Sequence, residues 1–132
     1  MFEVKVTKNM FIAHSLNDDL FGLAKNLHGA TYIIDLIISS KKLTKQNIVI
    51  DIDLALKLLE EVILKYNYKN LDDIPEFKNI LTTTEFMSKK ITEDFIEKLH
   101  EVNFNIKNLY SIKIILNESH IASASYLTII NE

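Results

Sequence analysis

No cysteine occurs among the 132 residues of the sequence. Its absence excludes disulfide bonds, thiolate metal ligands and a cysteine nucleophile. Arginine is absent as well, because all 15 basic residues are lysine. Without a guanidinium group, the chain has no side chain that binds phosphate or carboxylate in a bidentate fork.

Long apolar runs are also missing, and no stretch reaches the roughly 18 consecutive apolar residues that a membrane-spanning helix requires. The N-terminal segment MFEVKVTKN alternates in polarity and lacks a signal-peptide pattern, so we expect a cytoplasmic protein. The net charge is −3, and lysines are interspersed with acidic residues, which argues against nucleic-acid binding. A length of 132 residues, 48% of them hydrophobic and 25% charged, predicts one soluble domain over residues 1–132.

Four segments have the pattern of β-strands. Phe2, Val4 and Val6 alternate with polar residues, which predicts a half-buried strand that continues to His14. Residues 31–39 are rich in β-branched side chains, which favour strands. Apolar and polar residues alternate again in residues 110–116, which predicts a third strand. Residues 123–130 are predicted to form the fourth strand. The polar segments 15–26 and 41–47 are predicted to be a loop and a turn.

Two segments between these strands have helical patterns. Apolar residues recur at helical spacing from Ile52 to Tyr66, and Asp51 is predicted to cap this helix. Thr82 and Glu85 have the spacing of a capping box, which predicts a second helix that ends at about His100. The order β-β-α-α-β-β predicts an α+β fold, with a four-stranded antiparallel sheet and two helices on one face.

Two histidines are the first candidates for chemistry. His14 lies in FIAHS and His28 in KNLHGAT, and neutral imidazole is a good zinc ligand. A third nitrogen ligand would complete the set that leaves one open position on a catalytic zinc, but Ala30 follows two residues after His28. The pair can equally be two ordinary histidines at strand ends. His100 is expected at the end of the second helix and His120 in the turn after the third strand.

Five short motifs occur in order along nearly the whole chain: FIAH (11–14), LHGA (27–30), NYKNLD (67–72), LTTTE (81–85) and NES (117–119). Together they resemble the 6-pyruvoyl-tetrahydropterin synthase family, including the bacterial 6-carboxytetrahydropterin synthases. The corresponding family motifs read F-x-A-A-H, L-H-G-H, D-H-x-x-L-N, P-T-x-E and E-T. The resemblance implies the tunnelling fold (T-fold), in which subunits join their sheets edge to edge and active sites lie between subunits. It therefore also implies a homo-oligomer, specifically a hexamer.

The same resemblance implies zinc at His14 and His28, with Ala30 at the position of the third histidine ligand. Water, Asp18, Asp19 or a residue of a partner subunit could complete the zinc shell. No glutamate lies between Phe11 and His28, where some relatives that lack the family's cysteine use one.

Other catalytic positions of the family also differ in this sequence. Ala24 stands where bacterial relatives have the catalytic cysteine, and Asn67 and Tyr68 stand where the family has an Asp-His pair. Asparagine cannot stabilise an imidazolium, and a tyrosine hydroxyl, with an ordinary pKa of about 10, relays protons only where its surroundings lower that value. Alternatively, Tyr68 is a loop residue that covers the edge of the core.

The predicted binding residues match the family better. The resemblance implies that Glu118 accepts two parallel N–H bonds from the 2-amino group and the adjacent ring nitrogen of a pterin. It also implies that Thr83, Thr84 and Glu85 line the pterin pocket. The capping box at Thr82 and Glu85 would explain the same segment without any ligand.

These observations predict a divergent family member that keeps a pocket for a pterin or a purine-like ring. The losses at the catalytic positions predict that the family's lyase reaction on dihydroneopterin triphosphate is impaired or absent. Two alternatives are an active lyase or aldolase with a rewired site, and a non-catalytic assembly module. The resemblance places the chain in pterin or queuosine biosynthesis.

Overall fold

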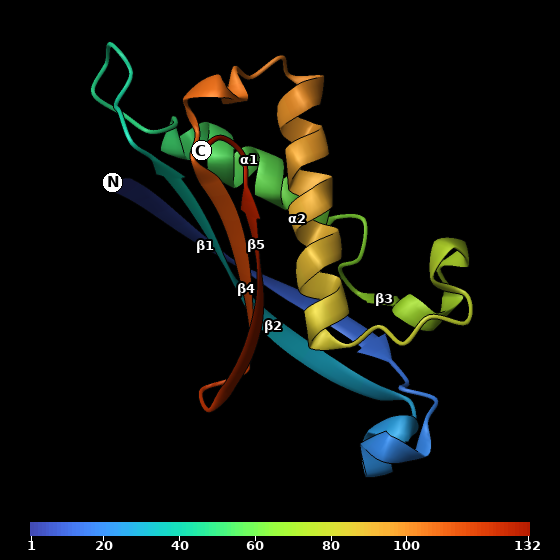
Figure 1. Ribbon diagram of the computed structural model, residues 1–132. Coiled ribbons are helices and arrows are strands. Elements are labelled where there is room, and N and C mark those ends of the chain that lie inside the picture. Colours follow the sequence, from blue (N-terminus) through green and yellow to red (C-terminus); the bar gives the residue numbers. More distant parts are fainter.

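A computed structural model describes all residues, 1–132, and shows a curved five-stranded sheet with two helices packed on one face (Figure 1). The strands are β1 (Phe2–His14), β2 (His28–Ser40), β3 (Lys69–Asn70), β4 (Ser111–Ser119) and β5 (Ala122–Ile129). The helices are α1 (Ile52–Ile63) and α2 (Thr84–Glu101). The strand order in the sheet is β3-β1-β2-β4-β5.

The sheet has one strand more than the sequence predicts, and that strand is parallel. β3 has two residues and pairs with Ile12 and Ala13 of β1 in parallel orientation. The prediction of a wholly antiparallel, four-stranded sheet is therefore wrong at this edge. The cause is local to Asn67 and Tyr68: the Asn67 side-chain oxygen accepts from the backbone N–H of Phe11 at 2.9 Å, and the Tyr68 N–H donates to the Phe11 carbonyl. These two bonds hold the loop after α1 against β1, and residue periodicity does not encode them.

The long hairpin of β1 and β2 positions the histidines. Its register runs from Phe2 opposite Ser40 to His14 opposite His28. β2 begins three residues earlier than the predicted 31–39, because pairing with β1 continues to the end of that strand. The loop predicted at 15–26 contains 3-10 turns at Asp19–Lys25, which fold around Gly22 at a φ of 56°.

One face of the sheet is apolar and packs under both helices. Met10, Tyr32 and Leu116 are completely buried on this face because alternate residues of each strand point to the same side. Leu58 of α1 and Phe95 of α2 cover them and are equally buried. The hydrophobic effect of this single core is the main stabilising contribution to the fold.

The helix boundaries agree with the sequence at one end and differ at the other. Asp51 caps α1 as predicted, since its carboxylate accepts from the Asp53 N–H at 3.1 Å. α1 ends at Ile63, and the buried Tyr66 lies beyond it. α2 begins one residue later than the capping box implies, because Thr83 caps it by accepting from the Phe86 N–H at 3.1 Å.

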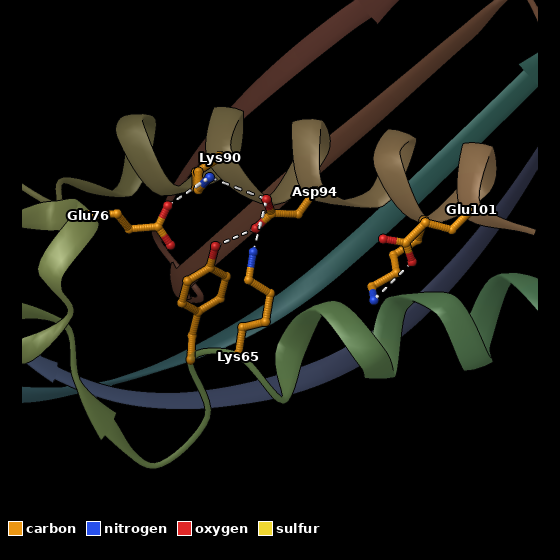
Figure 2. A network of polar contacts seen from close by, with 7 residues as sticks. Lys65, Glu76, Lys90, Asp94 and Glu101 are labelled. Atoms are coloured by element: carbon orange, nitrogen blue, oxygen red, sulfur yellow. Dashed lines mark hydrogen bonds and ion pairs between the residues drawn. The ribbon is translucent and has the colours of Figure 1, made fainter.

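An ion-pair network around the buried Asp94 connects α2 to the segment that follows α1 (Figure 2). Asp94 of α2 accepts a short hydrogen bond from the Tyr66 hydroxyl and lies 3.3 Å from the Lys65 ammonium. Lys90 bridges Asp94 at 3.4 Å and Glu76 at 3.2 Å. The network fixes the residues just after α1 to the middle of α2.

Neither helix is long and apolar enough to span a membrane.

Candidate functional site

The two histidines meet at the open end of the β1–β2 hairpin. His14 ends β1, His28 begins β2, and the two residues are directly opposite in the antiparallel register. Their ring centroids lie 4.6 Å apart with an angle of 63° between the planes. The pair that the sequence predicts is therefore formed within one chain.

Backbone carbonyls determine which ring nitrogens are free. His14 Nδ1 donates to the Thr82 carbonyl at 3.0 Å and also lies 3.1 Å from the Thr82 hydroxyl. His28 Nδ1 donates to the Asn26 carbonyl at 2.8 Å. Because a carbonyl oxygen only accepts, these contacts assign the proton to Nδ1 and leave a lone pair on Nε2 of each ring. Metal-binding histidines commonly have such a carbonyl partner on the second ring nitrogen.

Burial favours the neutral form of His14. Its side chain is only 3% exposed. Burial lowers the pKa of His14 below 6.5, and the nearby His28 lowers it further, whereas Thr82, Asp72 and Glu118 oppose the shift. A neutral imidazole can act as a metal ligand or as a hydrogen-bond acceptor at neutral pH.

Asp18 and Asp19, which the sequence predicts as possible further zinc ligands, have other partners within the chain. Ala30 pairs with Ile12 and packs against the core. Asp18 accepts from the Leu20 N–H, and Asp19 pairs with Lys25 at 2.7 Å. No group of three or more histidine, cysteine, aspartate or glutamate side chains is placed to hold a metal ion. The two histidines therefore offer two nitrogen donors, which is fewer than the three protein ligands of a catalytic zinc site.

The predicted ring-binding residues come together at a second position on the same side of the sheet. Thr84, Glu85 and Glu118 line an open pocket of about 370 Å³, together with residues 122–125 at the start of β5. Glu118 lies at an irregularity in the β4–β5 pairing, between Asn117 and Ser119. A bulge of this kind re-aims a side chain. Neither Glu118 nor Glu85 forms an ion pair, so both carboxylates are available to a ligand.

Tyr32 adds a buried hydroxyl beside this pocket. The hydroxyl lies 3.5 Å from the Thr84 side-chain oxygen, and the ring is completely buried. Burial raises the pKa of Tyr32, and the negative charges of Glu118 and Glu85 raise it further against the opposing effect of Thr84. Tyr32 is therefore a neutral hydrogen-bond donor at physiological pH. It lies four residues after His28, on the same face of β2, so alternation in the strand could have suggested it.

Thr82 does not have the role that the sequence predicts for it. The capping box predicts that Thr82 caps α2, but Thr83 does so and Thr82 contacts His14 instead. Thr83 therefore uses its side chain for the helix, and only Thr84 and Glu85 of the predicted segment line the pocket. Thr82 and Thr83 are adjacent in the sequence, and the residues around them do not show which of the two caps α2.

The residues at the usual catalytic positions lie elsewhere. The Asn67 amide oxygen is bonded to the backbone of β1, and the Ala24 carbonyl accepts from the Leu16 N–H at 3.0 Å. Tyr68 stacks on Phe11, whose neighbours Met10 and Ile12 point into the core. Phe11 and Tyr68 thus lie on the face of the sheet opposite the helices. Within one chain, Tyr68 and the histidine pair are on different faces.

Comparison with known proteins identifies the family of the chain. The family described as 6-pyruvoyl tetrahydropterin synthase matches residues 3–128. The chain belongs to this family. A relative from Dictyostelium discoideum, named 6-pyruvoyl tetrahydrobiopterin synthase, is 33% identical over 108 residues, which cover 79% of this chain and 74% of the relative.

Solved structures of 6-pyruvoyl tetrahydropterin synthases share the fold. The Caenorhabditis elegans structure has a TM-score of 0.78 at 23% identity and covers 95% of this chain and 94% of its own. The Plasmodium falciparum structure has a TM-score of 0.80 at 18% identity and covers 98% of both chains. The predicted α+β tunnelling fold is confirmed, apart from the additional strand β3.

Proposed function

We propose that the chain binds a pterin or a similar purine-like ring in the pocket formed by Thr84, Glu85 and Glu118. The observation that carries the proposal is the Glu118 carboxylate, which lies at the pocket with no cationic partner. The 2-amino group and neighbouring ring N–H of a pterin form a donor–donor edge that matches one carboxylate. Membership of the family supports a pterin-related role.

We further propose that the chain does not carry out the family's usual lyase reaction on dihydroneopterin triphosphate. That chemistry requires groups that move protons at the bound ring. The sequence has no thiol, and Asn67 uses its amide oxygen on the backbone of β1. Tyr68 lies on the opposite face from Glu118 of the same chain. Catalytic groups that act together fail together, so these replacements support a binding role.

A rewired enzyme is a second candidate, and the histidine pair favours it. Both Nε2 lone pairs of His14 and His28 are free, and both rings are held by carbonyls. A zinc ion there would need a further ligand from water or a partner subunit. We therefore assign no catalytic step to a metal.

An assembled homo-oligomer, which the family resemblance implies, is consistent with the sheet edges. β5 pairs only with β4, and β1 pairs with β3 at Ile12 and Ala13 alone. Long unpaired edges are available for strand pairing with another copy. The hexamer and the cytoplasmic location remain predictions.

Isothermal titration with neopterin and with guanosine tests the binding proposal. We expect saturable binding, weakened about ten- to a hundredfold in Glu118→Gln, because the amide loses the charge and one acceptor of the paired bonds. Glu85→Gln is the matched control, since it removes the other pocket carboxylate and should change affinity less. A wild-type protein that binds neither compound contradicts the proposal and supports an assembly module.

Turnover is measured separately by incubating the wild-type protein with dihydroneopterin triphosphate and following inorganic triphosphate. We expect no release above the protein-free rate. Release that is abolished by His14→Ala would instead establish the rewired enzyme.

A further inference from the structure

Three lysines gather at the end of the sheet that lies farthest from the histidine pair. The 13 residues of β2 separate the two ends, a distance of up to about 40 Å at roughly 3.3 Å per residue. Lys41 and Lys42 directly follow β2, and Lys107 lies in the 3-10 turn before β4. They line a recess of about 220 Å³ together with residues 108–110 and 131–132, beside the chain end marked C in Figure 1.

Positive charge exceeds negative charge in this recess. Glu132 is the only acidic residue that lines it, against three lysines. None of the three lysines forms an ion pair with an aspartate or glutamate side chain, whereas five other lysines of the chain do. The protein as a whole has a net charge of −3, so the local excess is opposite in sign to the overall charge.

Hydrogen bonds hold the segments around the recess in fixed positions. The buried Ser40 hydroxyl lies 2.5 Å from the Lys42 carbonyl oxygen and 2.6 Å from the Asn108 carbonyl oxygen. The Asn131 side-chain amide donates to the Leu109 carbonyl at 2.9 Å. The backbone after β2, before β4 and after β5 is therefore joined, and a ligand bound there would need to order little of the chain.

The Lys41 ammonium has two contacts at the wall of the recess. It lies 5.2 Å from the centroid of the Tyr110 ring, and it donates to the main-chain oxygen of Glu132 at 3.0 Å. A cation this close to the centroid of an aromatic ring is attracted to it. Because a lysine ammonium has three N–H donors, Lys41 can still donate to a ligand.

The size and the lining of the recess favour a small anion over a large ring. Its volume is below the roughly 300 Å³ at which pockets for drug-sized ligands begin, and only two of its eight lining residues are hydrophobic. Lysines bind phosphate as point charges and do not need the fixed geometry of an arginine fork. Two linked phosphate groups can reach ammonium groups from separate segments, whereas a single phosphate reaches fewer of them.

We propose that Lys41, Lys42 and Lys107 form a binding site for a small anion that has two or more phosphate groups. The site uses neither Glu118 nor the histidine pair, so it does not depend on the proposed binding of a pterin. All three lysines are exposed. Salt therefore screens their attraction for the anion, and the affinity should fall as the ionic strength rises.

Isothermal titration of the full-length protein with inorganic pyrophosphate, in metal-free buffer, tests the proposal. Inorganic phosphate and sulfate are compared at the same ionic strength. We expect saturable binding of pyrophosphate, about tenfold tighter than that of phosphate or sulfate, because two linked anionic groups contact more of the lysines. Lys42→Gln and Lys107→Gln should each weaken pyrophosphate binding about three- to tenfold, since each removes one of the three positive charges.

Two further variants test the place of binding. Lys45→Gln is the matched control, because Lys45 is an exposed lysine close in sequence that does not line the recess, and it should leave binding unchanged. Glu132→Gln removes the opposing charge and should strengthen binding about twofold. Neopterin binding should be unchanged in Lys42→Gln and Lys107→Gln, so failure of this site can be distinguished from failure of the pocket at Glu118.

Three results would overturn the proposal. The first is equal affinity for pyrophosphate and sulfate, which would show attraction to charge without selectivity. The second is an equal loss of affinity in Lys45→Gln and Lys107→Gln. The third concerns lipid headgroups as another source of clustered phosphate: we expect no sedimentation with vesicles that contain phosphatidic acid, and sedimentation that Lys107→Gln abolishes would identify a membrane surface in place of a free anion.

Discussion

His14 shows how a single buried side chain joins distant parts of the chain. It ends β1, contacts His28 across the hairpin and bonds to Thr82 before α2. The Thr82 carbonyl and hydroxyl both lie at Nδ1, so the orientation of the ring is defined by a residue 68 positions away. The free Nε2 is the atom through which any ligand of this histidine would be bound.

Acid should destabilise the protein through His14. Because the pKa of His14 is lowered in the folded state from 6.5, the unfolded chain binds the proton more tightly. This contribution to stability is fully present above about pH 6.5 and is lost as pH falls through and below that value. Urea unfolding between pH 7.5 and 5, with a metal chelator present, should show a falling free energy of unfolding.

His14→Gln is the comparison for this measurement, and it should unfold with a shallower pH dependence over the same range. His120→Gln serves as the matched control, since His120 lies in the exposed turn between β4 and β5. An identical slope for wild type and His14→Gln would show that other groups cause the acid sensitivity.

At the scale of the elements, the segment between α1 and α2 is fastened to the sheet at several points. Asn67 bonds to Phe11, and Asp72 accepts from both the backbone and the hydroxyl of Ser15. At the end of this segment, Thr82 contacts His14 and Thr83 caps α2. This connection therefore places Thr82 beside His14, and it also begins α2 next to the pocket at Glu118.

Adjacent threonines should have separable effects on this segment. Thr83→Ala removes the N-cap of α2 and should lower the free energy of unfolding by about 1 kcal/mol. It should also speed hydrogen exchange of the Phe86 amide, which donates to the Thr83 hydroxyl. Thr82→Ala should leave Phe86 exchange unchanged and instead shift the NMR signals of the His14 ring. The reverse pattern would restore Thr82 as the cap.

At the scale of the whole molecule, the core holds both helices to the sheet, and the network around Asp94 connects α2 to the segment that follows α1 (Figure 2). Asp94 is 4% exposed and is approached by Lys65, Lys90 and the Tyr66 hydroxyl. Burial raises the pKa of Tyr66, and the hydrogen bond to Asp94 raises it further. Burial alone would lower the pKa of Lys90, but Asp94 and Glu76 outweigh it and the net shift is upward.

Removal of the Asp94 carboxylate should therefore be costly. Asp94→Ala leaves the buried Tyr66 hydroxyl without a partner and should lower the free energy of unfolding by about 3 kcal/mol. Asp94→Asn keeps an acceptor for Tyr66 and should cost less. Glu101→Ala, which breaks the exposed pair with Lys98 on the same helix, should change stability by less than about 0.5 kcal/mol. Urea unfolding measures all three, and equal losses for Asp94→Ala and Glu101→Ala would contradict the role of the network.

Local patterns in the sequence were sufficient for the order of the main strands and helices. Alternation identifies β1 and β4, and helical spacing with Asp51 identifies α1, because both patterns arise from neighbouring residues. The resemblance of five motifs to the family added His14, His28 and Glu118 as candidates. The structure places the two histidines in contact and leaves Glu118 unpaired at a pocket.

The sequence alone therefore determined which elements form and which residue types are available for chemistry, including the absence of any thiol. Only the tertiary structure decided that Thr82 bonds to His14, that Asn67 attaches β3 to β1, and that Tyr68 lies on the outer face. These contacts depend on segments that are far apart in sequence and on which of several adjacent polar groups finds a partner. The free-energy differences between such partners are small, and they are resolved only when the core brings the segments together.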